Sequence, residues 1–292
     1  MEAVEASGGR ALLFDAESLN QTDFILDDRG VKFFDRDDRP QALGNCRGWM
    51  RRIAPEKWHE GVRLDGHSGV VRQAWGSVVA SLAELAEVTW LSHLPLIFAA
   101  ENKLVQLRAC RELGFRSPPT VLLTRRDRIP AEFGEDLVVK PYAAGHFRED
   151  TGDAKVVYAT AMARDDPRLD LLAGAPFLVQ PRLDAIAHRR IVTVKERAWV
   201  CEISAEGVSL DWRATEHAHA SFRLVEDPEA GAQALRLAKH LEVGYSSQDW
   251  LVDQTGESHL LDLNPAGQWM FLPAAEAITS AIADWLMDDV AA

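Results

Sequence analysis

Cysteine is scarce in this chain of 292 residues. Its three cysteines, Cys46, Cys110 and Cys201, lie far apart, and none has a second Cys or a His at the spacing of metal ligands. This argues against a disulfide framework and against a structural zinc site. We therefore expect reduced thiols and a cytoplasmic protein.

Long apolar runs are also missing. The most apolar stretch, 90–100, is interrupted by Ser92, His93 and Pro95, whereas a membrane span needs roughly 18 consecutive apolar residues. The first ten residues contain two glutamates and no apolar segment, unlike a signal peptide. The sequence therefore predicts no membrane partner.

Basic residues are outnumbered, with 32 Lys and Arg against 45 Asp and Glu and a formal net charge of -13. Because nucleic-acid binding needs clustered cations, we expect no nucleic-acid partner. The Walker-type phosphate loop, Gly-x-Gly-x-x-Gly, Gly-x-Ser-x-Gly and His-Glu-x-x-His are all absent from the sequence. The function must therefore be read from less compact patterns.

The chain divides into three blocks, which we predict to be domains or subdomains covering 1–96, 97–178 and 179–292. The helices expected from apolar periodicity are 71–85, 101–113, 228–241 and 274–287. The strands expected from short apolar, β-branched runs are 88–91, 120–124, 136–140, 155–160 and 177–180, together with the hairpins 190–194/198–203 and 248–252/259–263. The segment 141–153 is polar and contains glycine, so we expect a mobile loop. This mixture predicts a mixed α/β (α+β) fold rather than a pure parallel sheet.

The second of these hairpins carries an acidic constellation. If its strands pair antiparallel, Asp249 can lie opposite Asp262, and Asp262 shares a face with Asn264 because strand side chains alternate. Three hard oxygen donors would then converge, which suits magnesium. The alternative is that the two acids are solvated at a strand edge and that Asn264 only starts a turn.

Cations and one amide stand at similar positions. Lys140 ends an apolar strand and Lys103 begins a helix, so each could meet a polyphosphate or could simply be solvated. Arg190 and Arg213 lie among strand segments, and a guanidinium matches phosphate or carboxylate oxygens. The alternative for Arg213 is an internal ion pair with Asp211. Gln180 is either a hinge residue facing adenine or the end of its strand.

Taken in order, these residues resemble the ATP-grasp superfamily, and within it the RimK-like branch that includes the microviridin-type graspetide synthetases. The segments that carry the resemblance are Arg51-Arg52-Ile53-Ala54-Pro55 with Trp58, Asn102-Lys103 with Gln106-Leu107, Gly114 to Thr120, Val139-Lys140-Pro141, Val179-Gln180, Arg190 to Val194, Asp211-Trp212-Arg213 and Leu261 to Trp269. They span nearly the whole chain.

The resemblance implies an N-terminal pre-ATP-grasp domain followed by central and C-terminal subdomains that grip ATP. It implies ATP and Mg²⁺ as cofactors and the following site residues: Lys103, Lys140 and Gln180 for the nucleotide, Arg190 and Arg213 for catalysis, and Asp249, Asp262 and Asn264 for the metal. Two positions depart from the family pattern. Pro181 replaces a glutamate and has no N–H, so adenine recognition would move to Arg182 or Leu183. Asp262 also replaces a glutamate and is one methylene shorter, so it would bind magnesium less readily or draw its strand nearer.

The activity implied is a ligase that makes an acyl phosphate and passes the acyl group to an amine or hydroxyl. The favoured substrate is a ribosomal precursor peptide, with leader and core, in which side chains become joined by ester or amide bonds. We expect its acidic side chains near Arg189, Arg190 and the Asp211–Arg213 segment. A small-molecule carboxylate–amine ligase and an inactive peptide- or nucleotide-binding protein are the alternatives, and the oligomeric state stays open, a homodimer included.

Overall fold

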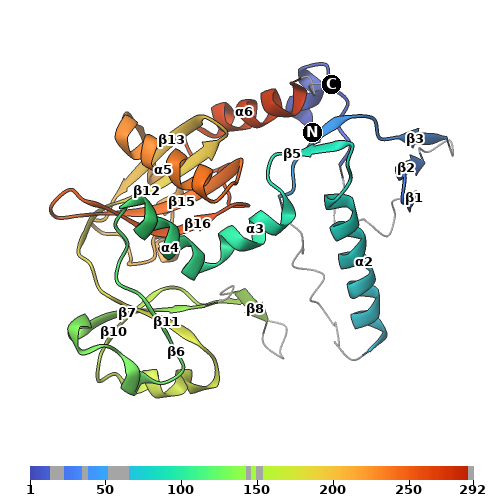
Figure 1. The fold of residues 1–292 in the computed structure, drawn as a ribbon. Coiled ribbons are helices and arrows are strands. Elements are labelled where there is room, and N and C mark those ends of the chain that lie inside the picture. The colour runs from blue at the N-terminus through green and yellow to red at the C-terminus, as the bar shows by residue number, and fades with distance from the viewer. Residues whose placement is uncertain (14–22, 35–38, 52–65, 143–145, 149–153, 289–292) are drawn as a thin grey trace.

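The computed structural model describes residues 1–13, 23–34, 39–51, 66–142, 146–148 and 154–288. It has mixed α/β architecture, as the sequence predicts. Its two large antiparallel sheets are a central sheet and a C-terminal sheet, and helices lie around the C-terminal sheet (Figure 1). The segment 52–58, which includes Trp58 and most of the arginine-rich motif, lies outside the described residues. No helix in the described part of the chain has the length and apolarity to cross a membrane.

The N-terminal block combines short strands with one long helix. Its elements are α1 (Glu2–Ala6), β1 (Phe24–Asp27), β2 (Gly30–Phe34), β3 (Pro40–Ala42), β4 (Cys46–Gly48), α2 (His67–Ala83) and β5 (Val88–Trp90). β1, β2 and β3 form an antiparallel sheet, and β4 pairs with β5 in parallel. The predicted helix and the strand at 88–91 are confirmed, but the apolar face of α2 is only partly covered. Leu82 is buried, whereas Val71 is 41% exposed.

Two consecutive helices follow, α3 (Leu94–Glu101) and α4 (Lys103–Leu113). The predicted helix at 101–113 is confirmed as α4, and Gly114 ends it in the left-handed conformation with φ of 71°. The sequence analysis missed α3, where Pro95 stands in the first turn. A proline is tolerated there because that N–H has no acceptor within a helix.

The central sheet has the order β10-β7-β11-β6 and is antiparallel throughout. Its strands are β6 (Val121–Leu123), β7 (Asp136–Pro141), β10 (Thr160–Ala163) and β11 (Phe177–Pro181). Its core gathers Leu137, Val139, Phe177 and Val179. In place of one strand at 155–160 there are two elements, because β9 (Ala154–Val156) ends before β10 begins. Nor is the preceding segment all loop, since β8 (His146–Arg148) pairs with β9.

The C-terminal sheet has the order β14-β13-β12-β15-β16 and is also antiparallel. Its strands are β12 (Ala185–Val194), β13 (Arg197–Ser204), β14 (Arg223–Val225), β15 (Tyr245–Asp253) and β16 (Ser258–Asn264). Both predicted hairpins are confirmed, and so are the helices α5 (Pro228–His240) and α6 (Ala275–Met287). α5 and α6 cover opposite faces, since Ile191 packs in the cluster with α5 while Val192 packs in the cluster with α6. In Figure 1 the C-terminal sheet is drawn above the central sheet, and α4 lies at the level between the two sheets.

Candidate active site

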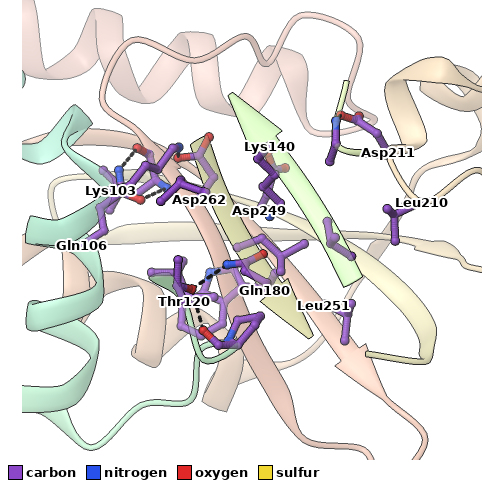
Figure 2. Close-up of a pocket in the computed structure, with 18 of the residues that line it drawn as sticks. Lys103, Gln106, Thr120, Lys140, Gln180, Leu210, Asp211, Asp249, Leu251 and Asp262 are labelled. Carbon is purple, nitrogen blue, oxygen red and sulfur yellow. Dashed lines mark hydrogen bonds and ion pairs between the residues drawn. The ribbon is translucent and has the colours of Figure 1, made fainter. Parts of the chain in front are cut away.

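A cavity of about 530 Å³ lies between the central sheet and the C-terminal sheet, with α4 forming one side. Residues predicted for the site that line it are Lys103, Lys140, Gln180, Leu183, Arg213, Asp249, Asp262 and Asn264. They come from six separate parts of the chain. Figure 2 shows how the side chains of Lys103, Lys140, Asp249 and Asp262 approach one another. The fold therefore brings together charges that are far apart in the sequence.

The two acids of the site lie on neighbouring strands of the C-terminal sheet. Asp249 on β15 and Asp262 on β16 are directly paired across the antiparallel ladder, as the spacing predicts. Asn264 pairs with Ser247 two residues further along, so it shares the face of Asp262. The register shifts just after Asp249, at a bulge between Asp249 and Trp250. The predicted convergence of these side chains is confirmed, and their role as metal ligands stays a prediction.

Lys103 forms an ion pair with Asp262 from the first turn of α4. Its position is fixed locally, because the Asn102 side chain caps the helix by accepting from the backbone N–H groups of Leu104 and Val105 at 3.0 and 3.3 Å. Burial opposes ionisation of Asp262, but the charge and hydrogen bond of Lys103, together with the charges of Lys140 and Arg190, hold the pKa of Asp262 below its usual value. Glu101 beside them has a raised pKa, because of burial and then repulsion from Asp262.

Lys140 stands at the end of β7 and reaches into the same space. Its strand is buried from Leu137 to Val139, and the side chain ends on the cavity wall. Burial lowers the pKa of Lys140 to about 8, although Asp262, Asp211 and Asp249 favour its charged form. A lysine held in this way gains most from a ligand that brings negative charge to it.

Arg190 lies behind Asp249. Its Nη1 donates to both carboxylate oxygens of Asp249, at 2.8 and 2.7 Å, and its Nη2 donates to the backbone carbonyl of Gln268 at 3.3 Å. The side chain is buried. The structure thus gives Arg190 a contact that orients Asp249, and its predicted catalytic role stays a prediction.

Arg213 belongs to a 3₁₀ turn, η6 (Trp212–Ala214), and not to a strand as the sequence analysis expected. The Asp211 side chain caps this turn and binds the guanidinium through two hydrogen bonds, of 2.8 Å from Nε and 2.6 Å from Nη2. Burial opposes ionisation of Asp211, but Arg213 outweighs it and lowers the pKa of Asp211. The ion pair considered as the alternative is present, and Arg213 still lines the cavity.

The same turn contacts the central part of the chain. Oδ2 of Asp211 accepts from the backbone N–H of Ala159 at 3.3 Å, and the guanidinium of Arg213 lies 5.9 Å from the ring centre of Tyr158. Tyr158 and Ala159 immediately precede β10 of the central sheet. Asp211 therefore holds Arg213 and joins the two walls of the cavity.

The wall formed by β11 carries the predicted hinge. Gln180 is buried, and its Nε2 donates to Oγ1 of Thr120 at 2.8 Å (Figure 2). The backbone N–H of Arg182 donates to the carbonyl of Asp136 at 2.9 Å, and its side chain borders a smaller neighbouring cavity of about 350 Å³. Leu183 borders both cavities. The role of Arg182 or Leu183 in adenine recognition stays a prediction.

The sequence analysis expected Arg189 and Arg190 to receive acidic side chains of a peptide. Both are already paired within the chain. Arg189 contacts Glu202 at 2.7 Å and Asp227 at 3.0 Å, while Arg190 pairs with Asp249. The structure therefore gives no support to a peptide contact at these two arginines.

Two further residues of the site were missed. His188 lies two residues before Arg190 on the same face of β12, is buried, and borders both cavities. Burial lowers the pKa of His188, against the influence of Asp249 and Asp211. Strand alternation from Arg190 could have found it. Gln106 is the second, and it was noticed only as part of the helix motif.

The donors on β15 and β16 fit a magnesium ion. Asp249 and Asp262 supply hard carboxylate oxygens beside a cavity with room for phosphates, which magnesium uses to complete its shell. Oδ1 of Asn264 accepts from the backbone N–H of Ala266 at 2.8 Å and keeps a second lone pair. Among the described residues no group of three or more His, Cys, Asp or Glu could hold a metal, so magnesium here would need the amide and the nucleotide as well.

No family model matches the chain, and no curated protein matches it. Solved structures do. Macrocyclase MdnC bound with precursor peptide MdnA, from Microcystis aeruginosa MRC, is 21% identical with a TM-score of 0.83, covering 99% of this chain and 94% of that one. A RiPP-associated ATP-grasp ligase of Chryseobacterium gregarium, in complex with ADP and a leader and core peptide, is 18% identical with a TM-score of 0.79, covering 99% and 92%.

A third similar structure is the ATP-grasp ligase PsnB complexed with minimal precursor, Mg and ADP. It is 18% identical with a TM-score of 0.75, and the match covers 98% of this chain and 91% of that one. These likenesses extend over nearly the whole length of each chain. The chain therefore has the ATP-grasp fold, as the sequence analysis expected.

Proposed function

We propose that this chain is an ATP- and magnesium-dependent ligase that activates a carboxylate as an acyl phosphate. The observation that carries the proposal is the cavity itself, where two lysines and an arginine face two paired aspartates between two sheets. Cations suit the phosphates of a nucleotide, and paired carboxylates suit the metal that accompanies them. The ATP-grasp fold supports the same reading.

Each residue of the site has a proposed role that follows from its position. Lys140 and Lys103 would bind phosphate oxygens, and Arg213 would stabilise negative charge that develops during phosphoryl transfer. Asp249, Asp262 and Asn264 would hold magnesium, which neutralises phosphate charge when bound. The substrate carboxylate attacks the γ-phosphorus of ATP, the bond to the bridging oxygen breaks, and ADP leaves. The protein contributes position and charge and forms no covalent bond.

Apolar side chains would receive the base of the nucleotide. Val138 and Leu178 of the central sheet and Leu210 and Leu251 of the C-terminal part border the cavity that Gln180 also lines. Apolar surfaces with a few polar groups are typical of such sites. The N–H of Leu183 would donate to the adenine ring in place of the N–H that Pro181 lacks.

The substrate we propose is a ribosomal precursor peptide, in which an Asp or Glu side chain becomes joined to a hydroxyl or amine of the same peptide. The support is that three similar structures of nearly equal length contain precursor or leader and core peptides. After phosphorylation, attack by the hydroxyl or amine on the acyl carbon releases phosphate and gives an ester or an amide. Net loss is one water per bond.

The experiment is to incubate the protein with ATP, magnesium and the short peptide encoded beside its gene. We expect ADP release, together with a fall in peptide mass equal to one water for each bond. Hydroxylamine then distinguishes esters, which it cleaves, from amides. ADP release with free amino acids but no change in the peptide would favour a small-molecule ligase, and no nucleotide binding would leave an inactive protein.

A further inference from the structure

Gln106 is a buried amide near the N-terminal end of α4, 2% exposed, and it is bonded to other elements. Its Nε2 donates to the carbonyl of Leu263 at 2.8 Å, and its Oε1 accepts from the N–H of Leu263 at 3.0 Å. The same Nε2 donates to the carbonyl of Ala100 at 2.7 Å. One side chain thus binds both backbone groups of a single residue on β16 and the end of α3.

Leu263, the residue that Gln106 binds, lies between two predicted metal ligands. Leu263 stands between Asp262 and Asn264, on β16, which is the last strand of its sheet. Leu263 pairs with Gln248 of β15, but its own N–H and carbonyl both point to Gln106 and so away from β15. The amide of Gln106 therefore bonds to β16 as the peptide group of one more strand would.

The other end of the contact lies beside Lys103. Ala100 ends the buried part of α3, and Glu101, Asn102 and Lys103 follow it directly. Figure 2 shows Gln106 and Lys103 on the same side of the cavity, next to Asp262. Gln106 thus fixes the distance between the helix that carries the ammonium and the strand that carries the carboxylate.

We propose that Gln106 is a positioning residue for the metal site. By clamping the backbone of Leu263, which lies between Asp262 and Asn264, Gln106 holds these two side chains in register. The inference rests on the proposed function, because it assumes magnesium at those donors. Without the clamp, two buried backbone groups lose their partners and the edge strand can shift relative to α4. Residues that orient metal ligands typically change metal affinity by about 10- to 100-fold when replaced.

The test compares Gln106→Met with Gln248→Met. Gln248 is an equally buried amide with three hydrogen bonds, to Ala234, Ser246 and Trp250, and its side chain makes none with α4 or β16. Both variants lose similar bonds, so both should unfold at lower temperature. We expect only Gln106→Met to weaken Mn²⁺ binding in the presence of a non-hydrolysable ATP analogue, by about 10- to 100-fold as measured by electron paramagnetic resonance.

In steady-state assays, the KM for magnesium of Gln106→Met should rise more than the KM for ATP, and added magnesium should restore the rate. Equal Mn²⁺ affinity in Gln106→Met and wild type would overturn the inference. Failure of the wild type to bind Mn²⁺ with the nucleotide would instead contradict the proposed function.

Amide hydrogen exchange of the wild-type protein gives a test that needs no variant. The clamp predicts that the Leu263 amide exchanges as slowly as amides inside β15. Exchange at the rate of an open strand edge would overturn the inference.

Discussion

Lys103 and Asp262 lie 159 residues apart in the sequence and form an ion pair at the N-terminal end of α4. The contact joins α4, which precedes the central sheet, to β16, the last strand of the C-terminal sheet. The candidate site is therefore complete only when both of these parts of the ATP-grasp fold are in place. Because Asp262 already has one cation, magnesium would have to share the carboxylate with Lys103 or displace the lysine. Several expectations depend on this arrangement.

The first concerns the donors themselves. Asp262→Ala and Asn264→Ala should each lower magnesium-dependent ADP formation by more than about 100-fold, since each removes an oxygen from a site that also relies on phosphates. The fold should survive, as both side chains border a cavity and not the core. Circular dichroism and ADP release measure the two effects. Asp284→Ala, which removes an exposed partner of Arg197, is the control, and turnover at the wild-type level in both site variants would remove the metal assignment.

A second expectation follows from the pKa of Lys140, which burial lowers to about 8. Below this pH the side chain is charged, and above it the charge is lost, so attraction for phosphates falls as the pH rises. The dissociation constant for ATP should increase about tenfold between pH 7 and pH 9, measured by tryptophan fluorescence.

Lys140→Met provides the comparison for this pH series. It should bind ATP weakly at both pH values and show little dependence between them. An unchanged wild-type affinity across the range would place the phosphates elsewhere.

A third expectation concerns Asp211. In Asp211→Asn, an N–H₂ group replaces one acceptor opposite the guanidinium of Arg213, so the arginine loses its fixed orientation. A catalytic group displaced by even 1 Å can lower the rate by up to about 100-fold. We expect a lower kcat with a smaller effect on the KM for ATP.

The chain contains a matched control for that change. Asp166 binds Arg168 in the same way, two residues apart at the start of a 3₁₀ turn, but on the surface. Asp166→Asn should leave kcat unchanged. If the two variants behave alike, the Asp211 contact is structural only.

A fourth expectation comes from a close approach of the backbone. A Cβ at Gly267 would lie 2.6 Å from Cβ of Ser247 and 3.1 Å from Nη2 of Arg190. Gly267→Ala should therefore destabilise the protein by about 1–3 kcal/mol and disturb the pair of Arg190 with Asp249. Gly76→Ala, in the middle of α2 with open space around it, should instead stabilise by about 0.5–1 kcal/mol. Thermal unfolding of both variants decides.

Much of the site could be predicted because its signals are local. The hairpin that carries Asp249 and Asp262 follows from two apolar runs joined by a short polar turn, and alternation places Asp262 and Asn264 on one face. The direct pairing of Asp249 with Asp262 also depends on the bulge after Asp249, because the register nearer the turn, with Trp250 opposite Leu260, would place Asp249 opposite Leu261. Lys140 could be recognised because an apolar strand ends in a cation. These patterns need no knowledge of the rest of the chain.

What could not be predicted depends on distant contacts. Nothing near Arg213 distinguishes a strand from the 3₁₀ turn that Asp211 caps, because the turn is held by packing of Trp212 against Phe222 and Phe271. Likewise Arg189 and Arg190 looked available for a ligand, but Asp227 and Asp249 reach them from later elements. The helix α3 was missed because Pro95 reads as an interruption until its place in the first turn is known.

The outer side of β16 has a consequence for solubility. An exposed edge strand is a template on which a second chain can add another strand, which leads to aggregation. Here Gln106 occupies the backbone groups of Leu263, and the carbonyl of Arg116 accepts the N–H of Leu260 at 2.9 Å. The opposite edge, β14, is only three residues long. Variants that free the β16 edge should therefore aggregate during refolding at concentrations where the wild-type chain stays monodisperse.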